Sequence, residues 1–412
     1  MTERLLHESR VDAAGRDEPL VSIIVNNFNY GRFLRDAIDS ALNQDYPRSE
    51  VIVVDDGSTD DSREIIADYG SRIKPVLKPN GGQASALNAG FAASRGDIIL
   101  FLDADDILFP HAVANVVPLL SRPGTSKVHW PMWLVDSAGA RTGGTRPAQV
   151  PLEGDFRQQV LARGPTNVAS SPTSGNAWCR HFLDRILPIP EDLAYYKSCA
   201  DEYLYTLAPV FGHVATIDEP QGCYRIHGEN VYSSLSFREQ LEMELSGYDE
   251  QCIALSNALG RNGIAVDTNE WKQHSWFHRL DRAVKDVMSA VPLGSKLVLV
   301  DGNTWGVGRE FEGRTVRPFL DKFGVDWGPP AADQMAINQL QFLRERDVQF
   351  LVIAWPCFWW LDEFTIFSKC LNEIATCVIR NEAVIIYDFQ LLTAESVARR
   401  GSSRTKGGRE HV

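Results

Sequence analysis

The stretch VSIIVNNFNYGRFL, from Val21 to Leu34, decides the fold together with VIVVDDGSTD (51–60) and DIILFLDADD (97–106). Each stretch contains a short, largely β-branched apolar run that ends in polar residues. Nearly continuous apolar runs of this length are typical of strands that are covered on both faces of a parallel sheet. Four runs predict such strands: Val21–Val25, Val51–Val54, Ile73–Leu77 and Ile98–Leu102.

Between the first two strands the apolar residues recur with the period of a helix. One apolar face is formed by Phe33, Leu34, Ala37, Ile38, Ala41 and Leu42. We expect Ser58 or Thr59 to cap the next helix, with Asp60 and Asp61 near its positive end. The alternation predicts an α/β fold with a doubly wound sheet and right-handed crossovers.

The composition limits the classes of function. The 412 residues are 44% hydrophobic, enough to bury two domains. A net charge of −13 argues against a nucleic-acid partner, which needs a basic face. It allows a nucleotide substrate, because a metal ion can neutralise phosphates locally.

The most apolar window runs from Phe350 to Phe367. It contains Pro356, Asp362 and Glu363, which a bilayer-spanning helix would tolerate poorly. We therefore expect a buried strand followed by an aromatic loop, and no transmembrane segment. Seven cysteines without a CxxC pair, and a first twenty residues without an apolar core, indicate free thiols in a reducing cytosol.

The rest of the chain divides by pattern. Residues 120–235 are irregular, 236–291 are mostly helical, and 292–395 again alternate strands with helices. In this last part we expect the strand Lys296–Val300, the helix Asp333–Arg346, the strand Gln349–Ala354 and strands near Val378 and Val384. We expect a flexible N-terminus over 1–18 and a disordered basic tail over 396–412.

Polar clusters follow three of the predicted strands. Asn26, Asn27 and Asn29 follow the first, Asp55 and Asp56 the second, and Asp103, Asp105 and Asp106 the fourth. Ligands of open parallel sheets bind beyond the carboxyl ends of the strands. An Asp after a strand can also simply cap a turn. Two acidic clusters on one edge nevertheless favour a ligand with donor groups and a divalent metal ion.

Asp103 and Asp105 are the candidates for the metal. Residues i and i+2 of an extended segment point the same way, so both carboxylates can address one site. Hard oxygen ligands suit Mg²⁺ or Mn²⁺, with water and diphosphate oxygens completing the coordination.

These motifs resemble the family 2 glycosyltransferases. The matching segments are VSIIVNNFNYGRFL, VDDGSTD, NGGQASALNAG (Asn80–Gly90) and RGDIILFLDADD, in this order, over roughly Pro19–Ser234. The resemblance implies a GT-A fold, a Rossmann-like nucleotide-diphospho-sugar transferase domain over 19–235. The segment 292–395 looks like an appendage found behind other domains of this family, a smaller C-terminal α/β domain without assigned chemistry.

The resemblance also implies roles for single residues. Asp55, Asp56, Asn27, Phe28 and Gly82 would bind the nucleotide. Asp103 and Asp105 would form the DxD motif, Asp103 also touching the nucleotide and Asp105 being preferred as the direct metal ligand. ADEYL (Ala200–Leu204) would supply the catalytic base, Asp201, with Glu202 as the alternative. YRIHGEN (Tyr224–Asn230) would close the site, with His227 near the metal or diphosphate, although a structural role for this histidine stays open.

The sequence departs from the family pattern in several places. Asn26 replaces a usual proline, Leu87 a frequent arginine and Ala200 a frequent acid. The leucine puts diphosphate contacts from the Gly-rich loop in doubt. The QxxRW motif of processive members is missing, which favours transfer of a single sugar.

Other features carry weaker hypotheses. His274 and His278 are four apart on a predicted helix but lack an HExxH context. DGNTWGVGREF (Asp301–Phe311) has Phe311 where a dinucleotide fingerprint needs a small residue. Trp359 and Trp360 could stack on a sugar, although an apolar run favours a core or an interface.

The function expected from these residues is inverting, metal-dependent transfer of one sugar. The donor is a nucleotide-diphosphate sugar, with a UDP-sugar favoured, and the acceptor is a saccharide or a lipid-linked hydroxyl. We expect a cytoplasmic protein, with peripheral contact at the inner membrane face left open and the oligomeric state unknown. The alternatives are a non-catalytic sugar-nucleotide-binding protein and a nucleotidylyltransferase, whose Gly-rich basic signature is missing after the first strand.

Overall fold

The computed structural model describes residues 18–165, 168–228, 230, 235–305, 310–322, 325–326 and 328–391. The predicted basic tail and all but the last residue of the predicted flexible N-terminus lie outside these residues. The chain splits into two compact units, Met1–Ser236 with Glu242–Ser275, and Phe237–Leu241 with Trp276–Val412.

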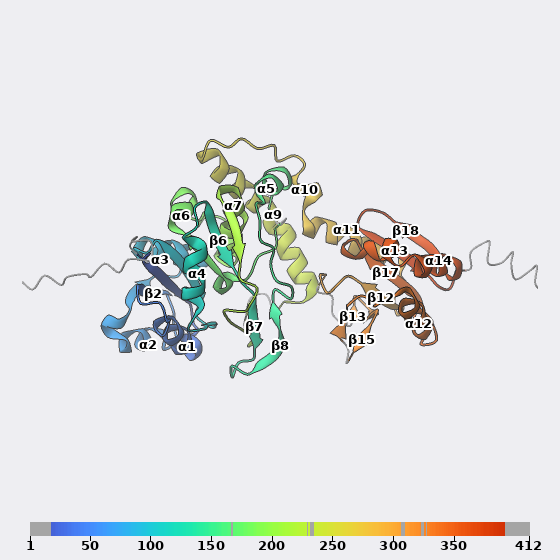
Figure 1. Ribbon diagram of the computed structural model, residues 1–412, viewed down its shortest axis with the longest axis horizontal. Helices are drawn as coiled ribbons and strands as arrows, with labels where there is room; N and C mark the ends of the chain where they lie inside the picture. The colour runs from blue at the N-terminus through green and yellow to red at the C-terminus, as the bar shows by residue number, and fades with distance from the viewer. Residues whose placement is uncertain are drawn as a thin grey trace, which may run out of the picture. The chain divides into compact units, whose positions relative to one another are not determined.

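A seven-stranded sheet forms the centre of the first unit (Figure 1). Its strands, in spatial order, are β10 (His213–Thr216), β6 (Thr125–His129), β9 (Asn176–Cys179), β4 (Ile98–Asp103), β1 (Val21–Asn27), β2 (Ser49–Asp56) and β3 (Lys74–Lys78). All neighbouring pairs are parallel except those of β9, which runs antiparallel to β4 and β6. The carboxyl ends of β1, β2 and β4 therefore meet at one edge.

Helices cover both faces of this sheet, because successive residues of a strand point to opposite faces. Val21, Ile23 and Val25 pack in one core with residues of α1 and α4, whereas Ile24 and Ile52 pack in another with residues of α3 and α7. The helices of this part are α1 (Gly31–Leu42), α2 (Ser62–Asp68), α3 (Gln83–Ala93), α4 (Ala112–Leu120), α5 (Arg157–Arg163), α6 (Arg180–Ile186) and α7 (Ala200–Phe211). Short 3₁₀ turns lie at η1 (Gly70–Arg72), η2 (Thr173–Gly175) and η3 (Tyr195–Lys197).

A smaller sheet brings the YRIHGEN segment to the same edge. Its order is β5 (Ile107–Leu108), β11 (Gly222–Arg225), β7 (Met132–Val135) and β8 (Arg141–Arg146). Because β5 directly follows the DxD motif and pairs with β11, the residues after β11 return to Asp105. Two further helices, α9 (Phe237–Arg261) and α10 (Trp271–His274), follow in the chain, α9 being divided between the units at Leu241.

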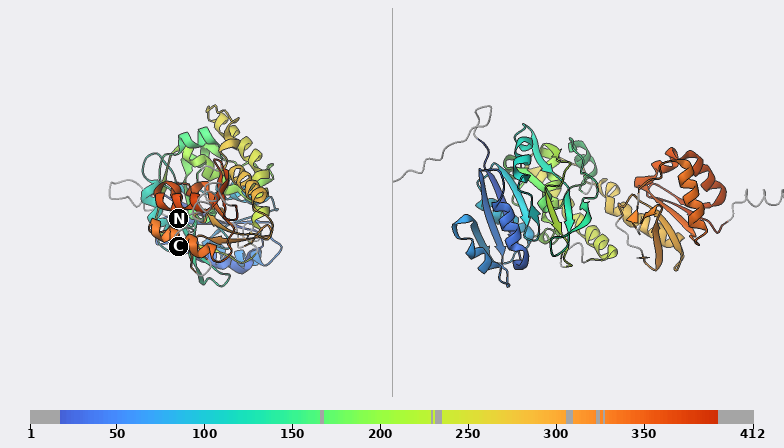
Figure 2. Two further views of the ribbon diagram at one scale, coloured as in Figure 1. Left: turned by 90° about the vertical axis from the view of Figure 1, so that its right-hand side faces the viewer. Right: turned by 60° about the horizontal axis from the view of Figure 1, so that its bottom comes forward.

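The second unit is a small α/β structure, drawn orange to red in Figure 2. Its six-stranded sheet has the order β13 (Glu310–Phe311), β14 (Arg314–Pro318), β12 (Lys296–Val300), β17 (Phe350–Ala354), β19 (Val384–Asp388) and β18 (Thr376–Arg380). The two-stranded pair is β15 (Asp321–Lys322) with β16 (Val325–Asp326). The helical elements are α11 (Trp276–Ala290), α12 (Asp333–Arg344), η4 (Trp355–Cys357), α13 (Trp359–Glu363) and α14 (Thr365–Ile374).

The predicted fold class, an α/β GT-A domain with a smaller C-terminal α/β domain, is confirmed. Three of the expectations for single elements are wrong. The helix after β2 begins at Ser62 and has no side-chain cap. The Ser58 hydroxyl instead accepts from Asn27 Nδ2 and from the Asn29 backbone N–H, and the Thr59 hydroxyl donates to Asn29 Oδ1.

The other two corrections concern residues after position 270. The predicted aromatic loop after β17 is helical, and within it Trp360 is buried while Trp359 stays 47% exposed. His274 and His278 do not share a helix, since α10 ends at His274 and α11 begins at Trp276. Among the residues described, no helix is both long and apolar enough to span a membrane.

Gly90 gives a test of how tightly α3 packs on the sheet. A Cβ at this position would lie 2.3 Å from Ile24 Cγ2 and 3.1 Å from Val54 Cγ2. We expect Gly90→Ala to lower the free energy of unfolding by about 1–3 kcal/mol through overpacking. Gly260→Ala, also in a helix but with nothing within 4 Å of the added Cβ, should instead stabilise by up to about 1 kcal/mol. Thermal melting of both variants checks this, and equal shifts would contradict the close packing.

Candidate active site

The register of the parallel strands aligns the polar residues at the sheet edge. Asn26 of β1 pairs with Asp103 of β4, and Asn27 pairs with Asp55 of β2. The side chains repeat this pairing, since Asn26 Nδ2 donates to Asp103 Oδ1 at 2.6 Å and Asn27 Nδ2 donates to Asp55 Oδ1 at 3.2 Å. The two asparagines therefore each supply an amide donor to one of the two acidic clusters.

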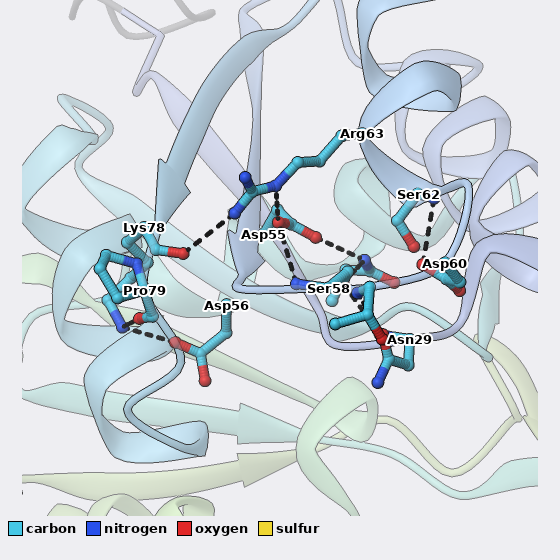
Figure 3. A network of polar contacts seen from close by, with 11 residues as sticks. Asn29, Asp55, Asp56, Ser58, Asp60, Ser62, Arg63, Lys78 and Pro79 are labelled. Carbon is cyan, nitrogen blue, oxygen red and sulfur yellow. Dashed lines mark hydrogen bonds and ion pairs between the residues drawn. The ribbon is translucent and has the colours of Figure 1, made fainter.

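Asp55 is fully buried, and other residues of the chain donate hydrogen bonds to its carboxylate. Its Oδ2 accepts from Arg63 Nε at 2.8 Å and from the Ser58 backbone N–H at 3.2 Å (Figure 3). Arg63 in turn donates to the carbonyl of Lys78, which ties β3 to this carboxylate. Asp55 thus shapes the loop after β2, and a nucleotide contact from it stays a prediction.

Asp56 holds the start of the Gly-rich loop. Its carboxylate accepts from Lys78 Nζ and from the backbone N–H groups of Gly81 and Gly82, the latter at 2.8 Å. Gly82 has φ +85°, which suits glycine, and a Cβ there would meet the backbone of Lys197 at 2.9 Å. This position therefore accepts no other residue without strain.

Phe28 differs from its neighbours because it is 45% exposed, whereas Asn27 is buried. The chain turns immediately after it, at Asn29 with φ 60°, whose side chain accepts from the Thr59 backbone N–H at 2.7 Å. An exposed ring beside buried amides is available for stacking on a flat ligand.

Asp105 is the carboxylate that the closing segment approaches. Its Oδ2 lies 2.9 Å from His227 Nε2 and accepts from Asn230 Nδ2 at 3.1 Å. Arg225, buried on β11, donates from Nε to the carbonyl of Asp105 and from its backbone N–H to Asp106 Oδ1. These contacts fix the DxD segment against the end of β11.

Asp105 and His227 offer a carboxylate oxygen and an imidazole nitrogen, which are donor types that divalent metal ions accept. In this structure the two are hydrogen-bonded to each other: Arg32 donates to His227 Nδ1 at 3.2 Å, so the ring proton is on Nε2, which donates to Asp105 Oδ2 at 2.9 Å. A metal ion bound by Nε2 would have to replace that proton. Asp103 does not join them: across the residues that the structure describes, no group of three His, Cys, Asp or Glu side chains could hold a metal. The remaining ligands would have to come from a diphosphate and water.

The other two acids of the cluster are poor anions. Burial, followed by the charge of Asp105, raises the pKa of both Asp103 and Asp106. Asp106 Oδ2 is buried without a hydrogen-bond partner, as expected of a neutral carboxyl group. Of the three acids after β4, Asp105 is the one that His227 and Asn230 approach.

Asp201 lies in the first turn of α7 and faces the DxD motif. The hydroxyl of Thr173, on η2, lies near the carboxyl groups of both Asp103 and Asp201 and lowers the pKa of each against the effect of burial. Gln83 connects η2 to the start of α7, because its side chain donates to Thr173 Oγ1 at 3.4 Å and accepts from the Ala200 backbone N–H at 2.8 Å. Burial raises the pKa of Asp201, although hydrogen bonds from Thr173 and the helix N-terminus oppose this. A raised pKa makes the carboxylate a stronger base at neutral pH.

Glu202 points the other way, into the core. It is hydrogen-bonded to Tyr195 and Tyr205 and lies near Glu244 of α9, to which Tyr195 Oη donates at 2.9 Å. Burial, together with the charge of Glu244, raises the pKa of Glu202 well above its usual range. Its carboxyl group therefore lies in the interior of the domain and not at the sheet edge.

The structure brings together most of the predicted site residues around one edge. Asn27, Asp55, Asp56 and Gly82 shape the loops over β1 and β2, and Asp103, Asp105, His227 and Asp201 gather over β4. Sequence reasoning missed Thr173, Gln83, Arg225 and Asn230. Thr173 and Asn230 lie within SSPTSGNAW and YRIHGEN, so closer attention to polar residues in these segments could have found them.

Comparisons with known proteins find a matching family model and several relatives. The family model "Glycosyl transferase family 2" matches residues 22–167. A glycosyltransferase of Nostoc sp. without an assigned substrate is 34% identical over 218 residues, which cover 52% of this chain and 67% of that protein. One of Rickettsia prowazekii is 41% identical over 104 residues, covering 25% of this chain and 33% of that protein. The chain thus spans about two thirds of the first relative and only a third of the second.

Solved structures overlay on about two thirds of the chain. TarS of S. aureus in complex with UDP-GlcNAc has 18% identity and a TM-score of 0.42, covering 66% of this chain and 82% of that one. The mannosyltransferase PcManGT of Pyrobaculum calidifontis, in complex with GDP-Man and Mn²⁺, has 19% identity and a TM-score of 0.41, with coverages of 67% and 77%.

Asp105 and its neighbour Asp106 allow a matched test of the metal site. We expect Asp105→Ala to abolish Mn²⁺-dependent binding of a nucleoside diphosphate, because it removes the one anion paired with His227. Asp106→Asn should leave binding near wild type, since an amide of the same shape can still accept from the Arg225 backbone N–H. Calorimetry with UDP and GDP, with Mn²⁺ and with EDTA, measures both. Unchanged metal-dependent affinity in Asp105→Ala would refute the assignment.

Proposed function

Because this chain belongs to glycosyltransferase family 2, we propose that it transfers a single sugar from a nucleotide-diphosphate donor to a hydroxyl acceptor with inversion at the anomeric carbon. The family makes the protein an enzyme that uses a nucleotide sugar. The inverting course, the metal dependence, the UDP-sugar preference and the acceptor are the parts that we infer.

One observation carries the inverting mechanism: a single carboxylate beside the DxD motif is oriented as a base. Thr173 contacts both Asp103 and Asp201, while the adjacent Glu202 is turned to Tyr195 and Tyr205. Asp201 also keeps partial solvent exposure, so that an acceptor hydroxyl can reach it. A direct displacement needs one such base, placed opposite the leaving group.

In the proposed mechanism each residue has a separate task. Phe28 and Asn27, with the loops held by Asp55 and Asp56, bind the nucleoside. Asp201 takes the proton of the acceptor hydroxyl as that oxygen attacks the anomeric carbon, and Thr173 fixes the direction of its carboxylate. Asp105 and His227 would hold Mn²⁺ or Mg²⁺, which stabilises the charge that develops on a departing diphosphate. Arg225 and Asn230 keep Asp105 in position.

The class of acceptor is inferred from the net charge and not from a contact in the site. The net charge of −13 disfavours nucleic acid, and we retain a saccharide or lipid-linked hydroxyl as the acceptor. A cytoplasmic location with peripheral contact at the membrane face is part of the same proposal.

A panel of nucleotide sugars tests the proposal. We expect one donor, with a UDP-sugar favoured, to be hydrolysed slowly with Mn²⁺ and not with EDTA, and to be transferred when a suitable hydroxyl is added. The stereochemistry of the product, read by NMR at the anomeric proton, should be inverted. Tight donor binding without turnover on any acceptor would favour a sugar-nucleotide-binding protein instead, and retention would exclude a single displacement.

Asp201 and Glu202 give a paired prediction for the base. We expect Asp201→Asn, which keeps the shape and removes the basicity, to lower turnover by a factor of about 10² or more, with donor affinity near wild type. Glu202→Gln should do much less, because that carboxyl group is buried against Tyr195 and Tyr205. Steady-state kinetics together with calorimetry separates turnover from binding. A larger loss of turnover in Glu202→Gln than in Asp201→Asn would show that the base is Glu202 and not Asp201.

For the C-terminal α/β unit we propose a scaffolding, acceptor-positioning or oligomerisation role. We also propose that the transferase domain extends beyond the predicted boundary at 235 and includes α9 from Glu242, since Glu244 bonds to Tyr195 in its core.

Truncation tests whether the C-terminal unit is needed for donor binding and hydrolysis. A chain ending at Ser275, where the first unit ends, should still bind and slowly hydrolyse the donor, because the proposed site residues all precede this point. Donor hydrolysis and circular dichroism are measured side by side. A folded truncation that no longer binds the donor would show that the second unit helps to build the site.

A further inference from the structure

The second unit has a switch point of its own at the carboxyl edge of parallel strands. β12 pairs in parallel with β14 on one side and with β17 on the other. The chain runs from β12 to β14 and then crosses back to β17, so the direction of the connections reverses at β12. In open α/β sheets, ligands bind beyond the carboxyl ends of the strands at such a point. The residues of the proposed transferase site all belong to the first unit.

The loop after β12 is a tight turn built on Asp301. This residue is buried, and its carboxylate accepts from the backbone N–H groups of Asn303 at 3.2 Å and Trp305 at 2.9 Å. Gly302 and Asn303 have φ of 63° and 59°, which turns the chain sharply. A Cβ at Gly302 would lie 3.5 Å from Cys357 Sγ, so this loop packs against the turn after β17. The turn therefore holds Trp305 at the end of the strand.

Three indole rings and one guanidinium group meet at this edge. Trp355 directly follows β17, and its ring centroid lies 5.7 Å from that of Trp305. From α11, the ring of Trp276 lies 4.6 Å from that of Trp355, and the guanidinium carbon of Arg279 lies over Trp355 at 4.8 Å. Trp305 is buried, whereas the other three side chains keep part of their surface exposed. We call these four residues the tryptophan cluster.

Two hydrogen-bond donors of the tryptophan cluster have no partner among the residues that the structure describes. They are Nε1 of Trp305 and Nε of Arg279, and both atoms are buried. A terminal nitrogen of Arg279 donates to the carbonyl oxygen of Glu382, which fixes the guanidinium group beside Trp355. Buried polar groups normally have a partner, because an unpaired one costs free energy. We therefore expect a ligand that offers acceptor oxygens next to indole rings.

A saccharide meets both requirements. The C–H face of a pyranose ring is apolar and packs on an indole ring, while its ring and hydroxyl oxygens accept hydrogen bonds. A nucleotide fits this edge less well. The next element described after β12 is the strand β13, so within the described residues the loop leads to no helix N-terminus that could bind a diphosphate. A cationic ligand is disfavoured because Arg279 already covers the Trp355 ring.

We propose that the tryptophan cluster is a saccharide-binding site, which holds a pyranose unit of a glycan at the carboxyl edge of β12 and β17. The inference goes beyond the proposed transferase function, because all four residues belong to the second unit. Binding at this site does not depend on the transferase function, whereas its use for positioning a glycan acceptor does.

Saccharide binding by the full-length chain is the measurement. The probes are neutral and acidic oligosaccharides built from glucose, GlcNAc, mannose, galactose or glucuronic acid, followed by saturation-transfer NMR and by tryptophan fluorescence. We expect at least one probe to bind, and Trp355→Ala to weaken its binding about tenfold or more, because the central ring is lost. Trp359→Ala is the matched control. It removes another exposed ring of the same unit, which packs on Trp360 and Phe364 instead, and should leave the affinity near wild type.

Two comparisons separate this site from the transferase site. Asp105→Ala should bind the probe as tightly as wild type, because the change lies in the first unit. Trp355→Ala should hydrolyse the donor with Mn²⁺ at the rate of wild type. Failure of the wild type to hydrolyse any donor would refute the proposed function and leave the binding result standing.

The remaining outcomes decide the proposal. It is overturned if no oligosaccharide of the panel binds the wild type at millimolar concentration. Binding that Trp355→Ala leaves unchanged, or that Trp359→Ala weakens equally, would also overturn it. Circular dichroism checks the fold of each variant, and Trp276→Ala repeats the test should Trp355→Ala fail to fold.

Discussion

The site depends on one constraint, that several carboxyl groups share one edge of a parallel sheet. In-register pairing of β1 with β2 and β4 brings Asp55 and Asp103 to the same level as Asn27 and Asn26. Neighbouring carboxylates repel each other. A protein can offset this repulsion with hydrogen-bond donors, by protonation of a carboxylate or with a bound cation. Two of these solutions occur here. Arg63 and backbone and side-chain N–H groups donate to Asp55, and Lys78 and backbone N–H groups donate to Asp56. Burial raises the pKa of Asp103 and Asp106.

The same constraint explains the division between neighbouring residues on α7. Adjacent positions of a helix point about 100° apart, so Asp201 and Glu202 cannot serve one site. Asp201 turns to Thr173 and the sheet edge, and Glu202 turns to a buried cluster with Glu244.

Much of this could be predicted from the sequence because it depends on local patterns. Strands β1, β2, β4 and β12 follow from their apolar runs, and the acids at their ends follow from the rule that ligands bind at carboxyl edges. The predicted cap of α2 is wrong because the hydroxyls of Ser58 and Thr59 bond to Asn27 and Asn29, contacts between separate loops that no local pattern contains. Thr173 and Gln83 could not be predicted for the same reason. Their proximity to Asp201 depends on β9 entering antiparallel between β4 and β6, which periodicity cannot reveal.

The central claim is that the DxD edge, His227 and Asp201 form one metal-assisted transfer site. The most direct measurement is a crystal structure of the full chain with Mn²⁺ and UDP, with the metal located by its anomalous scattering. The account predicts a single strong peak within about 2.3 Å of both Asp105 Oδ2 and His227 Nε2, with the diphosphate bound to the same ion and Asp201 facing the open side. A peak elsewhere in the chain, or a diphosphate bound without Asp105 among the ligands of the metal, would contradict it.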